Sequence, residues 1–346
     1  MRRLAGWMAL AVLVGLAGCG GSTSSLTGLE YLYVLNSGDM TISQFTINGD
    51  GSLTANTPAT LPASAGSTVL ATDVAGKYLF CGGASGITAY TVGAKGVLSA
   101  GVTTSVAQGA VTGLAVDPQD RFVFASAGGA TLVYSIQTGG VLGPAVTLTG
   151  VASSSLALDP GGNYLVTVAT GANTVSTWTV HADGSVTAIN SMPTGVGPTQ
   201  VVVDPNGAHV LVLNGGDRSV SLYGLATGTL GVSNVTTLPA STNPTNIEID
   251  TTGILVFVAN PAGNNFYQYG LPATGALLAL KPATLAGGSG TNSLVIEPSD
   301  TLAFGTNTAS NTVSTYDVTA GGLLNLQVTT NVGKDPTDAV VARVPK

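Results

Sequence analysis

Seven copies of one short pattern run through this chain and constrain its fold more than any other feature. Each copy contains an apolar stretch rich in β-branched and aromatic residues, and the stretches recur at intervals of about 45 residues. They begin at Tyr31, Tyr78, Phe122, Tyr164, His209, Leu255 and Leu302. A regular period of this size indicates a repeat architecture in which each copy forms one β-sheet unit.

A second strand in each copy carries an aromatic residue at an equivalent position. These residues are Phe45, Tyr90, Tyr134, Trp178, Tyr223, Tyr269 and Tyr316. A turn and a Gly-x-apolar step follow each aromatic, as in Gly96-Val97-Leu98. This combination predicts a hairpin that leads into a further strand.

An apolar strand that ends in an acidic turn precedes most copies, as in residues 201–207 (VVVDPNG). Asp at the first turn position accepts backbone N–H bonds, while Pro and Gly favour the second and fourth positions of a type I turn. We therefore interpret these acids as structural. Each unit then has four strands, here called a to d in chain order.

The first unit lacks its own strand a, because Tyr31 opens directly on strand b. The end of the chain supplies the missing piece, since residues 336–341 (PTDAVV) match residues 198–203 (PTQVVV). Pairing both ends of the chain leaves no open sheet edge between the first and last units. The sequence thus predicts an all-β, seven-bladed β-propeller over residues 29–346, with four antiparallel strands per blade and a ring closed by the C-terminal strand.

The N-terminus has the composition of a targeting segment. Arg2 and Arg3 precede an apolar stretch that is too short to span a membrane comfortably. The stretch ends in Leu16-Ala17-Gly18-Cys19, which resembles the lipobox of bacterial lipoproteins.

This resemblance implies a lipoprotein signal peptide over residues 1–18 and a lipidated Cys19. Residues 19–28 would then hold the lipidated cysteine and a flexible tether. We expect an exported protein, anchored through Cys19 to a membrane of the bacterial cell envelope and located at the outer membrane or cell surface.

Charge and composition exclude several functional classes. The chain has 17 Asp and Glu against 10 Lys and Arg, and no basic cluster occurs beyond the first residues, so a nucleic-acid partner is not expected. The two histidines lie far apart without a metal-ligand spacing, so no metal or cofactor is predicted. Cys81 lies in an apolar run and is interpreted as a buried packing residue.

The repeated motifs also carry a family resemblance, clearest in residues 201–225 and 293–324. The order is Pro-Thr, apolar-Asp-Pro-x-Gly, an apolar strand, Asn-x-Val-Ser-x-aromatic and Gly-x-Leu. It resembles the bacterial lactonase-like seven-bladed propellers, which include 6-phosphogluconolactonase and the lactonising-enzyme-like propellers. The resemblance implies the propeller fold and a lactonase activity, but the matched motifs are turn and packing elements, so no catalytic residue is carried over.

Few charged residues are predicted on the face of the propeller that carries the loops between strands b and c and the loops that join consecutive blades. They include Asp39, Asp217, Arg218 and Lys334. If this b–c loop face is catalytic, we expect Asp39 or Asp217 to act as the base and Arg218 and Lys334 as charge partners. The alternative is that these charges are only solvated loop tips.

Two functions remain open at this point. The scarcity of acid–base and metal-ligating residues favours a non-catalytic module that binds a protein, glycan or small molecule at the b–c loop face. The alternative is a lactone hydrolase that uses carboxylate-activated water. A phosphorylated lactone fits poorly, because few Lys or Arg residues are available to bind a phosphate.

Overall fold

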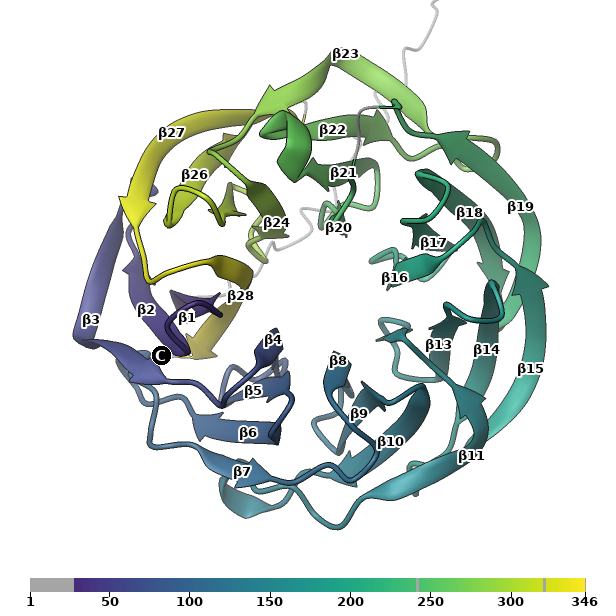
Figure 1. The fold of residues 1–346 in the computed structure, drawn as a ribbon, viewed down its shortest axis with the longest axis horizontal. Coiled ribbons are helices and arrows are strands. Elements are labelled where there is room, and N and C mark those ends of the chain that lie inside the picture. Colours follow the sequence, from purple (N-terminus) through teal and green to yellow (C-terminus); the bar gives the residue numbers. More distant parts are fainter. Residues whose placement is uncertain (1–27, 241–242, 320–321, 346) are drawn as a thin grey trace, which may run out of the picture.

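A ring of seven four-stranded antiparallel sheets surrounds a central axis (Figure 1). The computed structural model describes residues 28–345 apart from 241–242 and 320–321. Each sheet is one blade, with strand a nearest the axis and strand d at the rim. The predicted seven-bladed β-propeller is therefore confirmed.

The blades follow the chain, except that the first combines both ends. Blade 1 consists of β28 (Pro336–Pro345), β1 (Gly28–Asn36), β2 (Thr41–Ile47) and β3 (Leu53–Pro62). Blade 2 consists of β4 (Ser67–Thr72), β5 (Tyr78–Gly83), β6 (Gly86–Thr91) and β7 (Val102–Thr104). Blade 3 consists of β8 (Val111–Val116), β9 (Phe122–Ala127), β10 (Ala130–Ser135) and β11 (Val146–Ala152).

The remaining blades repeat the same order. Blade 4 consists of β12 (Ser155–Leu158), β13 (Tyr164–Ala169), β14 (Thr174–Val180) and β15 (Val186–Pro193). Blade 5 consists of β16 (Pro198–Val203), β17 (His209–Asn214), β18 (Ser219–Ala226) and β19 (Thr229–Thr237). Blade 6 consists of β20 (Asn246–Ile249), β21 (Leu255–Asn260), β22 (Asn265–Gly270) and β23 (Leu278–Ala286). Blade 7 consists of β24 (Thr291–Ile296), β25 (Leu302–Asn307), β26 (Thr312–Val318) and β27 (Leu324–Asn331).

Helical structure in the described residues is confined to the single 3₁₀ turns η1 (Thr138–Gly140) and η2 (Pro261–Gly263). In the same part of the chain, no helix has the length and apolar character that crossing a membrane requires. The proposed signal peptide, Cys19 and nearly all of the tether lie outside the described residues, so the lipid anchor and the exported location stay predictions.

Strand b of blades 2 to 7 begins at the residue that the repeat predicts. The first strand b begins earlier, at Gly28, because β1 pairs along its whole length with the C-terminal strand β28. In that pairing Glu30 faces Arg343, and their side chains form an ion pair. The predicted ring closure is thus confirmed.

The aromatic residues of strand c pack between neighbouring blades. The Tyr90 hydroxyl donates to the carbonyl oxygen of Pro62 at 2.9 Å, at the end of strand d in the preceding blade. The Tyr223 hydroxyl makes the same bond to Pro193 at 2.6 Å. Apolar burial between neighbouring blades is therefore supplemented, in blades 2 and 5, by a hydrogen bond that satisfies the buried hydroxyl.

The acids at the a–b turns are structural, as predicted. Asp250 is buried, and its Oδ1 accepts the backbone N–H groups of Ile254 at 2.8 Å and Leu255 at 2.7 Å. Asp204 binds Ala208 and His209 in the same way. These carboxylates satisfy N–H groups that the turn leaves without a ladder partner.

Replacing Asp250 by Ala is expected to lower the free energy of unfolding by about 2 kcal/mol, because buried N–H groups lose their acceptor. Urea unfolding followed by circular dichroism would measure this. Asp183→Ala is the matched control, since Asp183 is exposed and binds only within its own hairpin. Equal losses in the two variants would show that the buried turn acid has no special role.

Candidate functional site

The a strands of all seven blades enclose a central channel with a cavity volume of about 680 Å³. The described residues that line it include three acids, Asp159, Glu248 and Asp338, and no Lys, Arg or His. Asp159 is one of the turn acids and binds the N–H groups of Gly161 and Tyr164. Glu248 and Asp338 lie within strands β20 and β28, not in turns. The structural role of the turn acids therefore does not account for these two residues.

Each a strand is the inner edge of its sheet, so half of its backbone N–H and C=O groups point into the channel. Side chains from the preceding blade cap several of these groups. Gln200 accepts the N–H of Ile247 at 2.8 Å and donates to its carbonyl oxygen at 3.2 Å. Asn246 accepts the N–H of Leu294 at 3.1 Å. A polar residue at this position therefore joins one blade to the next.

Asp338 holds the equivalent position on β28. Its Oδ2 accepts the N–H of Leu70 in blade 2 at 2.8 Å, and its Oδ1 accepts the N–H of Ala339 at 2.9 Å. Burial raises the pKa of Asp338 to about 7, although both hydrogen bonds act in the opposite direction. Asp338 thus combines a structural contact with a proton affinity that is unusual for an aspartate.

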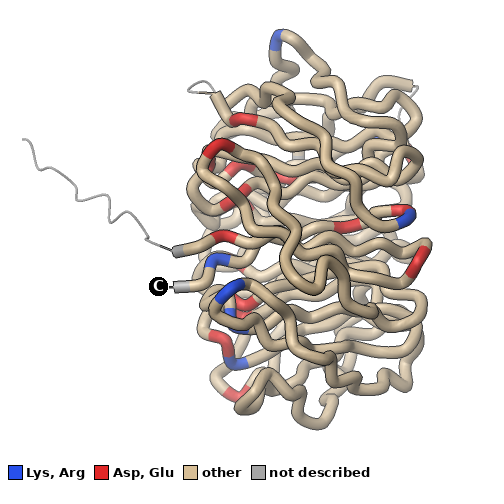
Figure 2. The backbone as a smooth tube through the Cα atoms, turned by 90° about the vertical axis from the view of Figure 1, so that its left-hand side faces the viewer, with Lys and Arg blue, Asp and Glu red and all other residues tan. Residues whose placement is uncertain are grey.

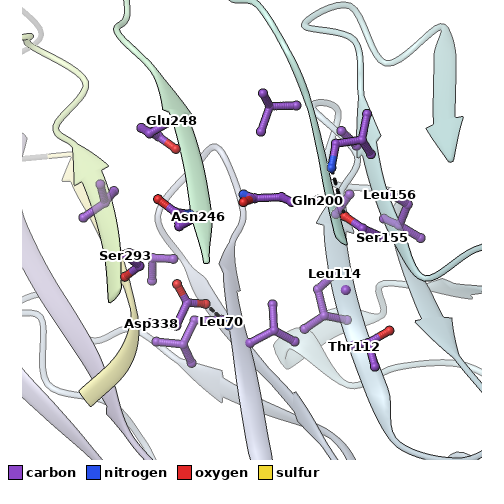
Figure 3. A pocket seen from close by; sticks show the side chains of 18 of the residues that line it. Leu70, Thr112, Leu114, Ser155, Leu156, Gln200, Asn246, Glu248, Ser293 and Asp338 are labelled. Atoms are coloured by element: carbon purple, nitrogen blue, oxygen red, sulfur yellow. Dashed lines mark hydrogen bonds between the residues drawn. The ribbon is translucent and has the colours of Figure 1, made fainter. Parts of the chain in front are cut away.

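Glu248 lies on β20, two residues after Asn246, and also lines the channel (Figure 3). Burial raises the pKa of Glu248 to about 8, and the negative charge of Asp338 is the second cause. A backbone hydrogen bond from Ile296 partly offsets the shift. The charge of Asp338 therefore contributes to the raised pKa of Glu248, and both carboxyl groups have pKa values near neutral pH.

A carboxyl pair of this kind can carry out acid–base chemistry at neutral pH. One group can be ionised and accept a proton while the other remains protonated and donates one. The surrounding Thr, Ser, Asn and Gln side chains supply hydrogen bonds, and Leu and Val side chains supply apolar contacts. The channel is therefore suited to a small, uncharged polar molecule with an apolar part.

The residues predicted from the sequence lie elsewhere, in two separate groups on the b–c loop face. Asp39 and Lys334 meet in blade 1, where the Lys334 N–H donates to Asp39 Oδ2 at 3.0 Å. Asp217 and Arg218 lie together in blade 5, which does not adjoin blade 1. The structure therefore does not bring all four into one cluster.

The two loop acids make similar contacts in their own blades. Asp39 accepts a bond from the Thr41 hydroxyl at 2.6 Å, and Asp217 accepts one from Ser219 at 2.7 Å. Each acid also binds a backbone N–H of the loop that connects two blades. Figure 2 shows that charged residues gather towards the opposite face, where the described chain ends lie. A catalytic role for these loop residues stays a prediction.

Sequence reasoning missed Glu248 and Asp338 because both occur in segments that match the strand-a pattern. An alignment of the repeats could have identified both acids, because all other blades carry an uncharged residue at the strand-a position of Glu248 and at that of Asp338. An ionisable side chain on the innermost strand of a propeller has to enter the channel or the contact between blades. That geometry makes it a candidate for function even where the surrounding motif is structural.

The other singled-out residues have packing roles. Cys81 is buried, and burial raises its thiol pKa to about 11, which agrees with the predicted packing role. His209 Nδ1 lies 3.0 Å from Asp204 Oδ2, and its Nε2 lies 3.2 Å from the carbonyl oxygen of Ala273. In the described part of the chain, no group of three or more His, Cys, Asp or Glu side chains is placed to hold a metal ion.

Solved structures share this architecture at low sequence identity. The Pseudomonas aeruginosa periplasmic gluconolactonase PpgL has a TM-score of 0.76 and 18% identity, over 92% of this chain and 100% of that chain. A Bacteroides fragilis protein provisionally described as a 6-phosphogluconolactonase has a TM-score of 0.76 and 16% identity, over 92% and 99% of the two chains. Hydrazine synthase of Kuenenia stuttgartiensis has a TM-score of 0.63 and 16% identity, over 80% and 95%. At these identities the likeness establishes the fold alone.

No curated protein sequence matches the chain. A family model does match, over residues 35–341, and it describes a lactonase with a 7-bladed beta-propeller. This match contradicts the expectation of a non-catalytic binding module, which was wrong, and favours the hydrolase alternative. The chain belongs to the lactonase family of seven-bladed β-propellers.

Proposed function

We propose that this protein hydrolyses lactones in its central channel. The observation that carries the proposal is a pair of carboxyl groups, Asp338 and Glu248, with pKa values near neutrality inside the channel of a lactonase-family propeller. The similarity in fold to a periplasmic gluconolactonase is consistent with this proposal.

Asp338 is the base in this reaction because its carboxylate accepts two backbone N–H bonds, which favour the ionised form. Its carboxylate takes a proton from a water molecule as the water oxygen attacks the lactone carbonyl carbon. The carbonyl π electrons move to oxygen, which gives a tetrahedral oxyanion.

Glu248 is the acid, because with a pKa of about 8 it remains largely protonated at neutral pH. When the oxyanion collapses, the ring C–O bond breaks and the leaving alkoxide takes the proton of Glu248. The product is an open-chain hydroxy acid. That acid and Asp338 each release a proton to solvent, Glu248 takes one back, and one proton is released in each turnover.

The substrate class follows from the charge of the channel. The described lining carries acids and no basic side chain. A phosphate or carboxylate on the substrate would lie near the Asp338 and Glu248 carboxyls without a cation to neutralise it. We therefore infer an uncharged lactone, with its apolar part against partly exposed lining side chains such as Val202 and Val295.

The test is a hydrolysis screen of purified protein from residue 28 onward, with acid release recorded in a pH-stat. We expect turnover of uncharged lactones and little turnover of 6-phosphogluconolactone. The rate should be greatest between about pH 7 and pH 8, since the base must be ionised and the acid protonated. A folded protein that hydrolyses no lactone would refute the proposal, and a preference for the phosphorylated lactone would refute the substrate class.

A further inference from the structure

Within the described residues, blades 3 and 4 each have one backbone N–H group that points into the channel and lacks the side-chain hydrogen-bond acceptor that the equivalent N–H group has in the other blades. Seven residues occupy one equivalent position on the a strands: Leu70, Leu114, Leu156, Val201, Ile247, Leu294 and Ala339. The hairpin register fixes the direction of their N–H groups. In blade 3 the N–H of Asp117 binds the carbonyl oxygen of Phe122, so Leu114, three residues earlier, belongs to a non-hydrogen-bonded pair and points its N–H into the channel.

Most of these amides have an acceptor from a side chain. Ser155 accepts the N–H of Val201, Gln200 that of Ile247, and Asn246 that of Leu294. Asp338 accepts those of both Leu70 and Ala339.

Leu114 and Leu156 are the exceptions. The corresponding residues of the preceding blades are Val69 and Gly113, whose side chains cannot accept a hydrogen bond. No side chain among residues that the structure describes caps either amide. Two residues further along each a strand, the side chains in the capping position are Ala or Val in every blade except blade 6, which has Glu248. Uncapped amides at that level are therefore common to nearly all blades and do not single out blades 3 and 4.

Gly113 keeps the approach to Leu156 open. A Cβ atom built on Gly113 would lie 3.6 Å from the Leu156 nitrogen, which is an ordinary contact distance. Position 113 therefore has room for a side chain over the amide, and the glycine leaves that room empty. Leu114 and Leu156 lie across the channel from Glu248 and Asp338 (Figure 3).

We propose that the backbone N–H groups of Leu114 and Leu156 bind the carbonyl oxygen of the lactone and stabilise the oxyanion that forms on it. This inference rests on the proposed hydrolysis, because it names the groups that stabilise the oxyanion formed in that reaction. Fixed amide donors aimed at the developing charge are the usual means of stabilising such an intermediate. The carboxyl pair then lies on the opposite side of the substrate, where water is activated.

Gly113→Ser tests the proposal by capping one donor, because the new hydroxyl takes the position that Ser155 holds towards Val201. We expect kcat to fall at least about tenfold with a smaller change in KM, since the lost bond strengthens in the transition state. Gly171→Ser is the matched control, because a Cβ at Gly171 meets nothing within 4 Å. A kcat unchanged by Gly113→Ser, in protein with a normal unfolding transition, would contradict the proposal.

A second measurement does not depend on turnover. Protein labelled with ¹⁵N-leucine reports Leu114 and Leu156 together with the capped amides of Leu70 and Leu294, and Leu→Ile variants assign the four signals. Titration with δ-valerolactam, whose carbonyl oxygen resembles that of a lactone, should move the Leu114 and Leu156 proton signals downfield and leave the capped pair in place. Equal shifts in all four signals, or none at the highest concentration, would overturn the proposal.

The two experiments separate this inference from the proposed function. Selective shifts in a protein that hydrolyses no lactone would support the amide site and refute the reaction. Lactone hydrolysis without selective shifts, and without an effect of Gly113→Ser, would support the reaction and refute the amide site.

Discussion

Replacing Asp338 by Asn is expected to lower kcat/KM for lactone hydrolysis by at least about a hundredfold, because a positioned general base contributes a factor of this size or more. Glu248→Gln should lower kcat by a comparable factor, since the leaving alkoxide would lose its proton donor. The measurement is the pH-stat assay with an uncharged lactone at the pH of greatest activity.

Both replacements are chosen so that the fold is kept. In Asp338→Asn the new amide side chain would still offer an oxygen acceptor to the N–H of Leu70, as Asn246 does for Leu294. In Glu248→Gln the new side chain has nearly the same volume as the old one. Loss of activity with an unchanged circular dichroism spectrum therefore reports the missing proton transfer. If Asp217→Ala or Asp39→Ala abolished activity and Asp338→Asn did not, the reaction would belong on the b–c loop face instead.

The fold was predictable because it repeats. Any single strand, such as residues 164–169, could have been misassigned, but seven copies of the same order reinforce one another. The closing strand was identified because residues 336–341 share the strand-a pattern and would otherwise have no unit to complete.

The site was less accessible to the same reasoning. The loop charges of Asp39 and Asp217 attracted attention because loops usually carry function, and the structure places them in blades that are not neighbours. The proton affinity of Glu248 comes from burial and from the charge of Asp338, which lies far away in sequence and reaches the channel only through ring closure. The uncapped amides of Leu114 and Leu156 depend on what the preceding blade lacks, which no local pattern reveals.

The same carboxyl pair should make the protein less stable as the pH rises. The pKa values of Asp338 and Glu248 are raised in the folded state to about 7 and about 8, so between about pH 4.5 and pH 8 the folded state holds protons that the unfolded state has released. Stability falls with pH wherever the folded state binds more protons. The loss is complete above the folded pKa values, where both carboxylates are charged inside the channel.

The double variant Asp338→Asn, Glu248→Gln should remove this loss. At pH 8.5 we expect it to be more stable than the wild type by about 3 kcal/mol, less than the full pKa shifts would give, because the channel admits water. At pH 3 the two proteins should agree within about 0.5 kcal/mol, since at that pH both carboxyl groups of the wild type are protonated in the folded and in the unfolded state. Other acids with raised pKa values, such as Glu30, are common to both proteins and cancel in the difference. Urea unfolding at the two pH values measures the effect. A difference that does not grow with pH would show that the carboxyls are not perturbed, and would remove the basis for assigning them acid–base roles.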